Sequence, residues 1–137
     1  MNIRSIVACC VIVMSMAYAC EAQVRYRITG TFTNAFWHEE AGDLLGIELR
    51  IVLAKGYVFQ GTLQWFEGGP VDLRLVNVVV EDNHIILEDI GNPGVSIFEG
   101  AVERDGIRGY FKGFSEEQFL RREPGYWEKL GMNYPEY

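Results

Sequence analysis

The sequence predicts an all-β domain, an antiparallel meander of about eight strands closed into a small barrel. Three observations support this prediction: apolar and polar residues alternate along many stretches, short turn signals separate those stretches, and no helix-length 3.6-residue period follows residue 23. The clearest alternation places five apolar residues on one side of a strand: Leu45, Ile47, Leu49, Ile51 and Leu53. Closure removes the unpaired edges of such a sheet. A two-sheet β-sandwich of the same strands is the alternative.

The first 22 residues are expected to be a signal peptide rather than part of the domain. Arg4 precedes an apolar run from Ile6 to Met16, and Ala17 and Ala19 follow it. That run is too short for a membrane span and has the small residues of a cleavage site. Residues 23–137 are then a single β-barrel domain with a short C-terminal tail. We expect the product to be periplasmic or secreted.

Cys20 adds a second possibility for the N-terminus. The segment before Cys20 also resembles a bacterial lipobox, so lipidation at this cysteine would anchor the product to the cell envelope. The other two cysteines, Cys9 and Cys10, lie inside the leader, so no disulfide is expected in the domain. The formal charge of −7 argues against binding to nucleic acid and against charge-driven binding to anionic lipid. Any membrane association is therefore expected only through Cys20.

The strands are delimited by their turn signals. Lys55-Gly56 and Asp105-Gly106 predict tight hairpins, and Pro70 and Pro93 mark further breaks. Residues 33–42 have no clean period and are expected to be a connection. The expected strands are residues 24–32, 42–54, 57–66, 72–80, 84–90, 95–103, 107–114 and 117–122. Residues 126–137 are expected to form a short helix-like cover or a frayed tail.

Four segments resemble a group of small exported bacterial proteins of uncharacterised function. They are Gly30-Thr31-Phe32-Thr33-Asn34, Glu39 to Asp43 with Gly46-Ile47-Glu48-Leu49, Gly61-Thr62-Leu63-Gln64, and Gly125-Tyr126-Trp127. The resemblance implies a signal or lipoprotein leader and a compact lipocalin-like or avidin-like β-barrel. It implies no catalytic residue. This chain departs from the group at Gly125, where a polar residue is expected.

The aromatic residues are the candidates for the core and for a ligand site. Seven are expected largely to share the apolar side: Tyr26, Phe32, Tyr57, Phe59, Trp65, Phe98 and Phe111. An eight-stranded barrel is either just filled or able to hold one small ligand, and side chains this bulky favour filling. If a cavity exists, Trp65 and Tyr57 would line it, with Gln64 or Asn77 as polar contacts at a bulge. Trp127 is expected to plug one end of the barrel, or else to mark a partner surface.

An acidic segment is the candidate partner surface. Trp37 is followed closely by Glu39, Glu40 and Asp43. The spacing lacks the alternating pattern of a calcium loop, so we expect a solvated acidic loop and no metal. His38 and His84 alone do not make a usual zinc site.

No catalytic arrangement is recognisable, because Ser96 and Ser115 lack a nucleophile-elbow context. Neither an enzyme nor a cofactor is expected. We expect an exported non-enzymatic barrel that binds a small apolar molecule or an envelope protein. The alternatives are a structural or inhibitory interaction module with a filled core, and a small outer-membrane barrel.

Overall fold

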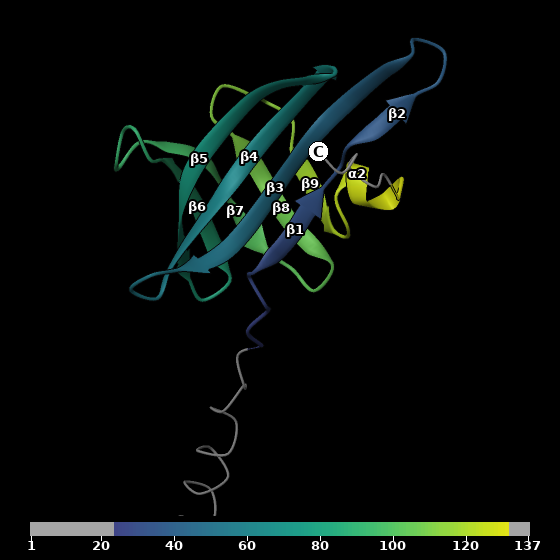
Figure 1. The fold of residues 1–137 in the computed structure, drawn as a ribbon. Helices are drawn as coiled ribbons and strands as arrows, with labels where there is room; N and C mark the ends of the chain where they lie inside the picture. The colour runs from purple at the N-terminus through teal and green to yellow at the C-terminus, as the bar shows by residue number, and fades with distance from the viewer. Residues whose placement is uncertain (1–23, 132–137) are drawn as a thin grey trace, which may run out of the picture.

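The computed structural model describes residues 24–131, which form a closed antiparallel β-barrel (Figure 1). The expected leader with Cys20 and the last six residues lie outside this range. The strands are β1 (Gly30–Thr33), β2 (Phe36–His38), β3 (Asp43–Ala54), β4 (Val58–Gly68), β5 (Pro70–Glu81), β6 (His84–Asp89), β7 (Ser96–Val102), β8 (Gly106–Phe111) and β9 (Gln118–Arg122). One four-residue helix, α2 (Tyr126–Lys129), follows them. Between residues 24 and 131, no helix is long and apolar enough to cross a bilayer.

Eight of the nine strands close the barrel. The sheet runs in the order β1-β9-β8-β7-β6-β5-β4-β3, and β1 returns to pair with β3. Each neighbouring pair is antiparallel, as the short turns predict. The closed barrel is thus confirmed in place of the sandwich. The ninth strand, β2, pairs with the first residues of β3 and lies beyond the closed wall.

The first strand is shorter than the sequence predicts. β1 begins at Gly30, and residues 24–29 form no strand but pack Tyr26 and Ile28 against the barrel core. Their backbone carbonyls bond to side chains instead of to a ladder. The Arg122 guanidinium donates to the carbonyl oxygens of Arg27 and Thr29, and the Asn83 amide donates to the carbonyl oxygen of Val24. This segment therefore closes one end of the barrel.

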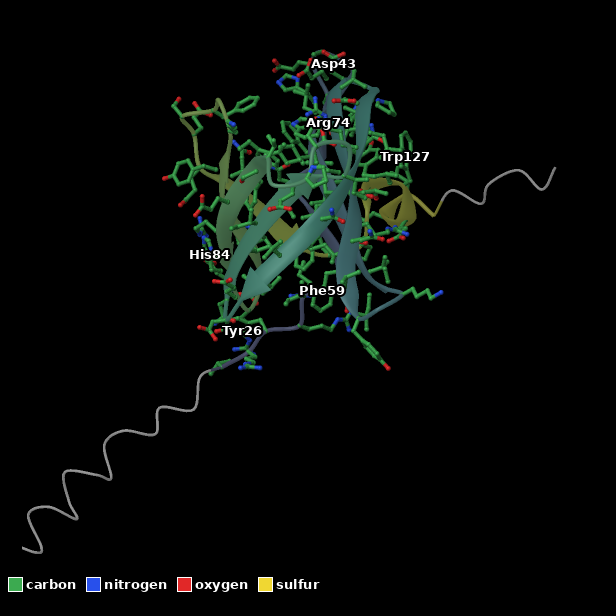
Figure 2. All side chains as sticks on the ribbon, turned by 90° about the vertical axis from the view of Figure 1, so that its left-hand side faces the viewer. Tyr26, Asp43, Phe59, Arg74, His84 and Trp127 are labelled. Atoms are coloured by element: carbon green, nitrogen blue, oxygen red, sulfur yellow. The ribbon has the colours of Figure 1, made fainter. Side chains whose placement is uncertain are left out.

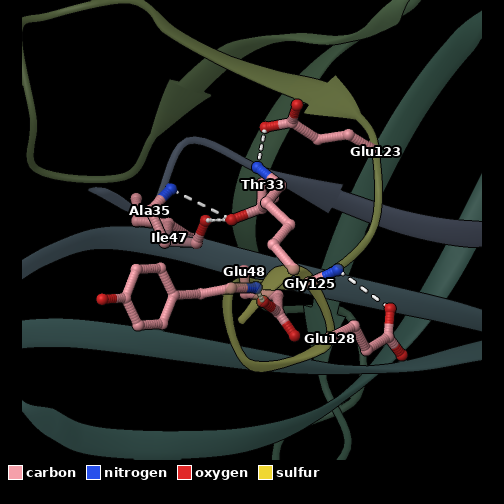
Figure 3. A network of polar contacts seen from close by, with 9 residues as sticks. Thr33, Ala35, Ile47, Glu48, Glu123, Gly125 and Glu128 are labelled. Atoms are coloured by element: carbon pink, nitrogen blue, oxygen red, sulfur yellow. Dashed lines mark hydrogen bonds and ion pairs between the residues drawn. The ribbon is translucent and has the colours of Figure 1, made fainter. Parts of the chain in front are cut away.

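The strand β2 was not predicted, because the residues around it have no alternating period. Thr33 and Asn34 redirect the chain there, and Figure 3 shows the contacts of Thr33. The Thr33 hydroxyl donates to the Ile47 carbonyl at 3.0 Å and accepts from the Ala35 amide at 3.0 Å, while Asn34 Oδ1 accepts from the Ile47 amide at 2.7 Å. These side chains replace part of the β1–β3 ladder, and the chain then continues beside the start of β3 as β2.

The interior of the barrel is filled with side chains, as the aromatic content favours. Fourteen buried residues form one cluster, which includes the Ile47, Leu49 and Ile51 side chains of the alternation in β3. Gly100 and Gly109 face each other across β7 and β8. A Cβ built on Gly109 would lie 2.6 Å from the Gly100 Cα and 2.7 Å from the Phe98 ring. The glycine pair thus admits the large rings of a small barrel.

The helix α2 packs on the outside of the barrel wall. Tyr126 and Trp127 cover a second small cluster of Ala35, Leu44 and Phe66. The prediction that Trp127 plugs a barrel end is therefore wrong, because Leu44 and Phe66 lie on the outward faces of β3 and β4. Figure 2 shows Trp127 at the side of the barrel, between the end near Tyr26 and the end near Arg74.

Polar contacts fix α2 to β3 (Figure 3). Glu48 accepts from the Tyr126 amide at 2.9 Å, and Arg50 pairs with Glu128 at 2.5 Å. A hydrogen bond from the Gly125 amide, together with Arg50, lowers the pKa of Glu128 below its ordinary value. A Cβ on Gly125 would lie 2.7 Å from a Glu48 carboxylate oxygen. A side chain at position 125 would therefore have to displace the Glu48 carboxylate that accepts from the Tyr126 amide.

Candidate functional site

The two ends of the barrel differ, and the end opposite Tyr26 holds a pocket. Its volume is about 580 Å³, and it opens where β4 and β8 end and β5 and β7 begin. Figure 2 places Arg74 toward this end and Tyr26 and Phe59 toward the other. The pocket is lined by Trp65, Glu67, Val71, Asp72, Arg74, Ile97, Phe111, Lys112 and Phe114. We call it the mouth pocket.

The floor of the mouth pocket is aromatic. Trp65 on β4 meets Phe111 on β8 edge-on, with ring centroids 5.4 Å apart, and Phe111 lies 4.8 Å from Phe98 below it. Gly113 has a φ of 90°, which turns the chain after β8 and returns the Phe114 ring to 6.5 Å from Phe111. Because Phe98 is buried and Phe114 is exposed, this row of edge-on and tilted rings runs from the core to solvent. It offers a binding molecule an apolar aromatic surface.

The rim of the pocket carries charged side chains from β4, β5 and the end of β8. Arg74 Nε donates to Asp72 Oδ2 at 2.8 Å, and the Arg74 guanidinium lies over the Trp65 ring at 5.5 Å from its centroid. A register shift between β4 and β5 beside Trp65 places these residues at the mouth. Glu67 and Lys112 complete the rim. Two acidic and two basic groups balance, so the rim has no net charge.

The structure separates the four residues that the sequence suggested for a ligand. Trp65 lies in the floor of the mouth pocket. Tyr57 lies in the β3–β4 turn at the opposite end, 89% exposed, and does not join Trp65. Gln64 and Asn77 alternate with inward residues, so both face outward. Gln64 lies at the expected bulge and donates to the carbonyl oxygens of Trp65 and Asp72. Asn77 accepts a hydrogen bond from Gln60.

The four residues of the predicted partner surface remain together. Trp37 lies on the edge strand β2 and is half-exposed, Glu39 and Glu40 are exposed in the β2–β3 turn, and Asp43 opens β3. His38 Nδ1 in this turn accepts from the Ala41 amide at 3.3 Å. In the part of the chain from Val24 to Gly131, no three His, Cys, Asp or Glu side chains are grouped to hold a metal ion.

Most of the mouth pocket was missed by the sequence analysis. Asp72 and Arg74 lie four and two residues before the buried Val76, so the alternation along β5 carries them to the inward face. The sequence alone does not mark this face as the inward one, because Leu73 and Leu75 make the opposite face of β5 equally apolar. Phe114 depends on the turn at Gly113, which alternation does not describe.

The comparisons with known proteins add no relative: no protein-family model, no curated protein and no solved structure matches the chain. The geometry itself defines the class. The protein is a small, closed, eight-stranded antiparallel β-barrel, consistent with a lipocalin-like barrel, with one additional strand.

Proposed function

We propose that the protein is an exported, non-enzymatic β-barrel that binds a small, largely apolar molecule in the mouth pocket. The observation that carries this proposal is the aromatic floor of a pocket of about 580 Å³. Ligand sites in proteins typically enclose about 300–1,000 Å³ and combine an apolar lining with a few polar groups. The filled interior leaves the mouth, rather than the barrel centre, for this role.

The form of the pocket favours a planar ligand. Such a molecule can stack on the Trp65 ring, in the place that the Arg74 guanidinium occupies in this structure, or it can pack against Phe114. The neutral rim gives no preference for either sign of ligand charge. An apolar body with one hydrogen-bonding group fits best, because Arg74 and Lys112 donate and Glu67 and Asp72 accept.

A fluorescence titration tests the proposal. Phenylnaphthylamine, a planar apolar probe whose emission rises in apolar surroundings, is added to the purified protein. For a ligand of about twenty non-hydrogen atoms we expect a Kd of about 10–100 µM. Phe114→Ala should weaken binding, whereas Tyr110→Ala, a half-exposed aromatic on the outside of β8, serves as the matched control. Failure of every probe in a panel of planar apolar molecules to bind would contradict the proposal.

Export is the second part of the proposal and rests on the leader. The first 22 residues have the composition of a signal peptide, as in the small exported bacterial proteins that the sequence resembles. Mass spectrometry of the N-terminus of the protein isolated from its host tests this directly. Cleavage before Cys20 with an added lipid mass indicates an envelope anchor, and cleavage without it indicates a free product. An intact Met1 would contradict export by this route.

The membrane-barrel alternative receives no support from the distribution of side chains. A transmembrane barrel carries an apolar band on its outside and polar groups inside. Here the inside holds the buried apolar cluster, and charged residues face outward on several strands: Glu48 and Arg50 on β3, Glu88 on β6, Glu99 on β7 and Arg108 on β8. We therefore do not propose it.

A protein partner is the second candidate, and the exposed aromatics of β2 favour it. Phe36 and Trp37 are 51% and 50% exposed beside the acidic turn with Glu39 and Glu40. Exposed aromatic residues are typical anchors of interfaces. If this surface binds an envelope protein, wild-type protein should recover that partner from envelope extracts and Trp37→Ala should not. Equal recovery by both would contradict this use of β2.

A further inference from the structure

The charged groups on the rim of the mouth pocket are not equivalent, although their net charge is zero. Arg74 lies toward the open end of the barrel (Figure 2), with its guanidinium 5.5 Å from the centroid of the Trp65 ring. Lys112, the other basic group of the rim, lies over no aromatic ring in the described part of the chain. Arg74 therefore occupies the face of the pocket floor on which a planar ligand would stack.

The register of β4 and β5 brings Arg74 to this place. Arg74 pairs with Leu63, and Trp65 is the next residue of β4 that faces the same side. The register shift beside Trp65 leaves this residue without a paired residue on β5. The Arg74 side chain can therefore reach diagonally across the two strands and cover the Trp65 ring from the side of β5.

A single ion pair holds the Arg74 guanidinium over the ring. Arg74 Nε donates to Asp72 Oδ2 at 2.8 Å, and the side chains are 46% and 52% exposed. Ion pairs and cation–ring contacts that are this exposed to water are individually weak. A ligand that stacks on Trp65 can therefore move the guanidinium aside, while Asp72 keeps it beside the bound ring.

The guanidinium retains hydrogen-bond donors for the ligand. The Asp72 contact uses only Nε, and Nη1 and Nη2 donate to no protein acceptor among residues 24–131. These two nitrogens form a planar fork that matches the two oxygens of a carboxylate. We propose that the ligand is a planar aromatic anion, whose ring displaces Arg74 from Trp65 and whose carboxylate binds Nη1 and Nη2. This proposal rests on the mouth pocket being the ligand site and makes Arg74 the residue that selects the ligand.

A competition experiment at neutral pH tests the proposal. Phenylnaphthylamine, which is uncharged, reports occupation of the pocket, and naphthoate or naphthylmethylamine displaces it. The two competitors share one ring system and carry opposite charges. We expect naphthoate to bind at least about tenfold more tightly than naphthylmethylamine. Arg74→Ala should abolish this preference, because it removes the fork, and should raise the affinity for phenylnaphthylamine about threefold, because it uncovers the Trp65 ring.

Two further variants separate the role of Arg74 from a general effect of charge. Arg25→Ala removes the same charge from an exposed position at the closed end and should change none of the three affinities. Arg74→Lys keeps the charge without the planar fork, so it should restore only part of the affinity for naphthoate. Because Arg74 is about half exposed, its variants should keep their fold, which circular dichroism checks.

The outcomes distinguish this proposal from the one on which it rests. If phenylnaphthylamine binds but naphthylmethylamine binds as tightly as naphthoate or more tightly, the site stands and the choice of an anion is overturned. The choice is also overturned if Arg74→Ala changes the affinities for the two competitors equally. If none of the three molecules binds, the proposed function fails together with this inference.

Discussion

The two ends of the barrel both carry aromatic side chains, but one end is covered by residues 24–29 and the other holds the mouth pocket. At one end, Tyr26 and Ile28 fold under the strands and pack against the core, together with Phe59. At the other end, Trp65 and Phe111 also pack on the core, but only Phe114 follows above them, and the mouth pocket stays open. Aromatic side chains therefore close one end and line a site at the other.

The ends differ because the segments that connect to the strands take different paths at each end. Residues 24–29 cross the closed end because side chains of Arg122 and Asn83 bind their carbonyl oxygens. At the open end, the register shift between β4 and β5 and the turn at Gly113 hold the chain at the rim. The pocket is thus restricted to one end by the hydrogen bonds that hold residues 24–29 across the other end, rather than by the composition of the core.

The largest expected effect is on stability and comes from the glycine pair of β7 and β8, in the core between the two ends. Gly109→Ala places a methyl group against the Gly100 backbone and the Phe98 ring, where no flexible side-chain end can yield. We expect a loss of about 3 kcal/mol in the free energy of unfolding. Urea denaturation measures it. Gly69→Ala, between β4 and β5, controls for the change of residue type, because a Cβ there meets nothing within 4 Å and its φ is not positive.

A matched pair of variants tests the contrast between the ends directly. Tyr26→Ala removes packing at the closed end and should lower the free energy of unfolding by about 1–2 kcal/mol, with ligand affinity unchanged. Phe114→Ala should do the reverse: stability within about 0.5 kcal/mol and probe affinity about tenfold lower. Thermal melts and probe titrations on both proteins give the four values. Equal effects of the two variants on probe affinity would refute the assignment of the site to one end.

A smaller effect is expected at Tyr57, in the turn beyond the closed end. Its φ of 61° is unfavourable for a large side chain, and its ring is exposed. Tyr57→Asn should therefore stabilise the protein by about 0.5 kcal/mol, because asparagine tolerates this conformation better. Probe affinity should not change, since Tyr57 lies far from Trp65. A lower probe affinity would instead show that Tyr57 belongs to the ligand site, as the sequence analysis suggested.

The smallest effect concerns α2, which lies at neither end. The pKa of Glu128 is lowered in the folded protein, so its contribution to stability is complete above its ordinary value of 4.5 and is lost as the pH falls through the folded pKa. We expect the Trp127 fluorescence to shift in that acidic range while probe binding at the mouth persists. Glu128→Gln should remove this part of the pH dependence. A transition near neutral pH would contradict the role given to Glu128.

The alternation of residues was sufficient to predict most of the barrel. Ile47, Leu49 and Ile51 are buried as expected, whereas Leu53 at the end of β3 is 52% exposed. The hairpin between β7 and β8 forms as expected, but its loop residues are Arg104 and Asp105, and Gly106 already belongs to β8 without a positive φ. The exceptions arise where side chains replace the ladder. Thr33 and Asn34 bond to Ile47 and create β2, and Arg122 binds the carbonyls of residues that would otherwise extend β1. Contacts so distant in sequence leave no periodic signal.

The candidate site was harder to predict, because it depends on which face of β5 points inward. Leu73 and Leu75 look more suited to a core than Asp72 and Arg74, yet the register with β4 places Arg74 opposite the buried Leu63. A nearly continuous apolar strand does not reveal its inward face by periodicity. The inward Asp72 and Arg74 of the mouth pocket and the outward Leu73 and Leu75 both follow from this choice of register.

Mapping of a bound probe by NMR tests the central claim most directly. Phenylnaphthylamine is titrated into isotope-labelled protein, and the shifts of backbone amides and of the indole N–H groups are followed. We predict that the Trp65 indole and the amides of Phe111, Lys112 and Phe114 shift together with one Kd, while Tyr26, Ile28 and Phe59 remain unchanged. Shifts centred on those three residues, or no saturable shift near Trp65, would contradict the claim that this barrel binds at its open end.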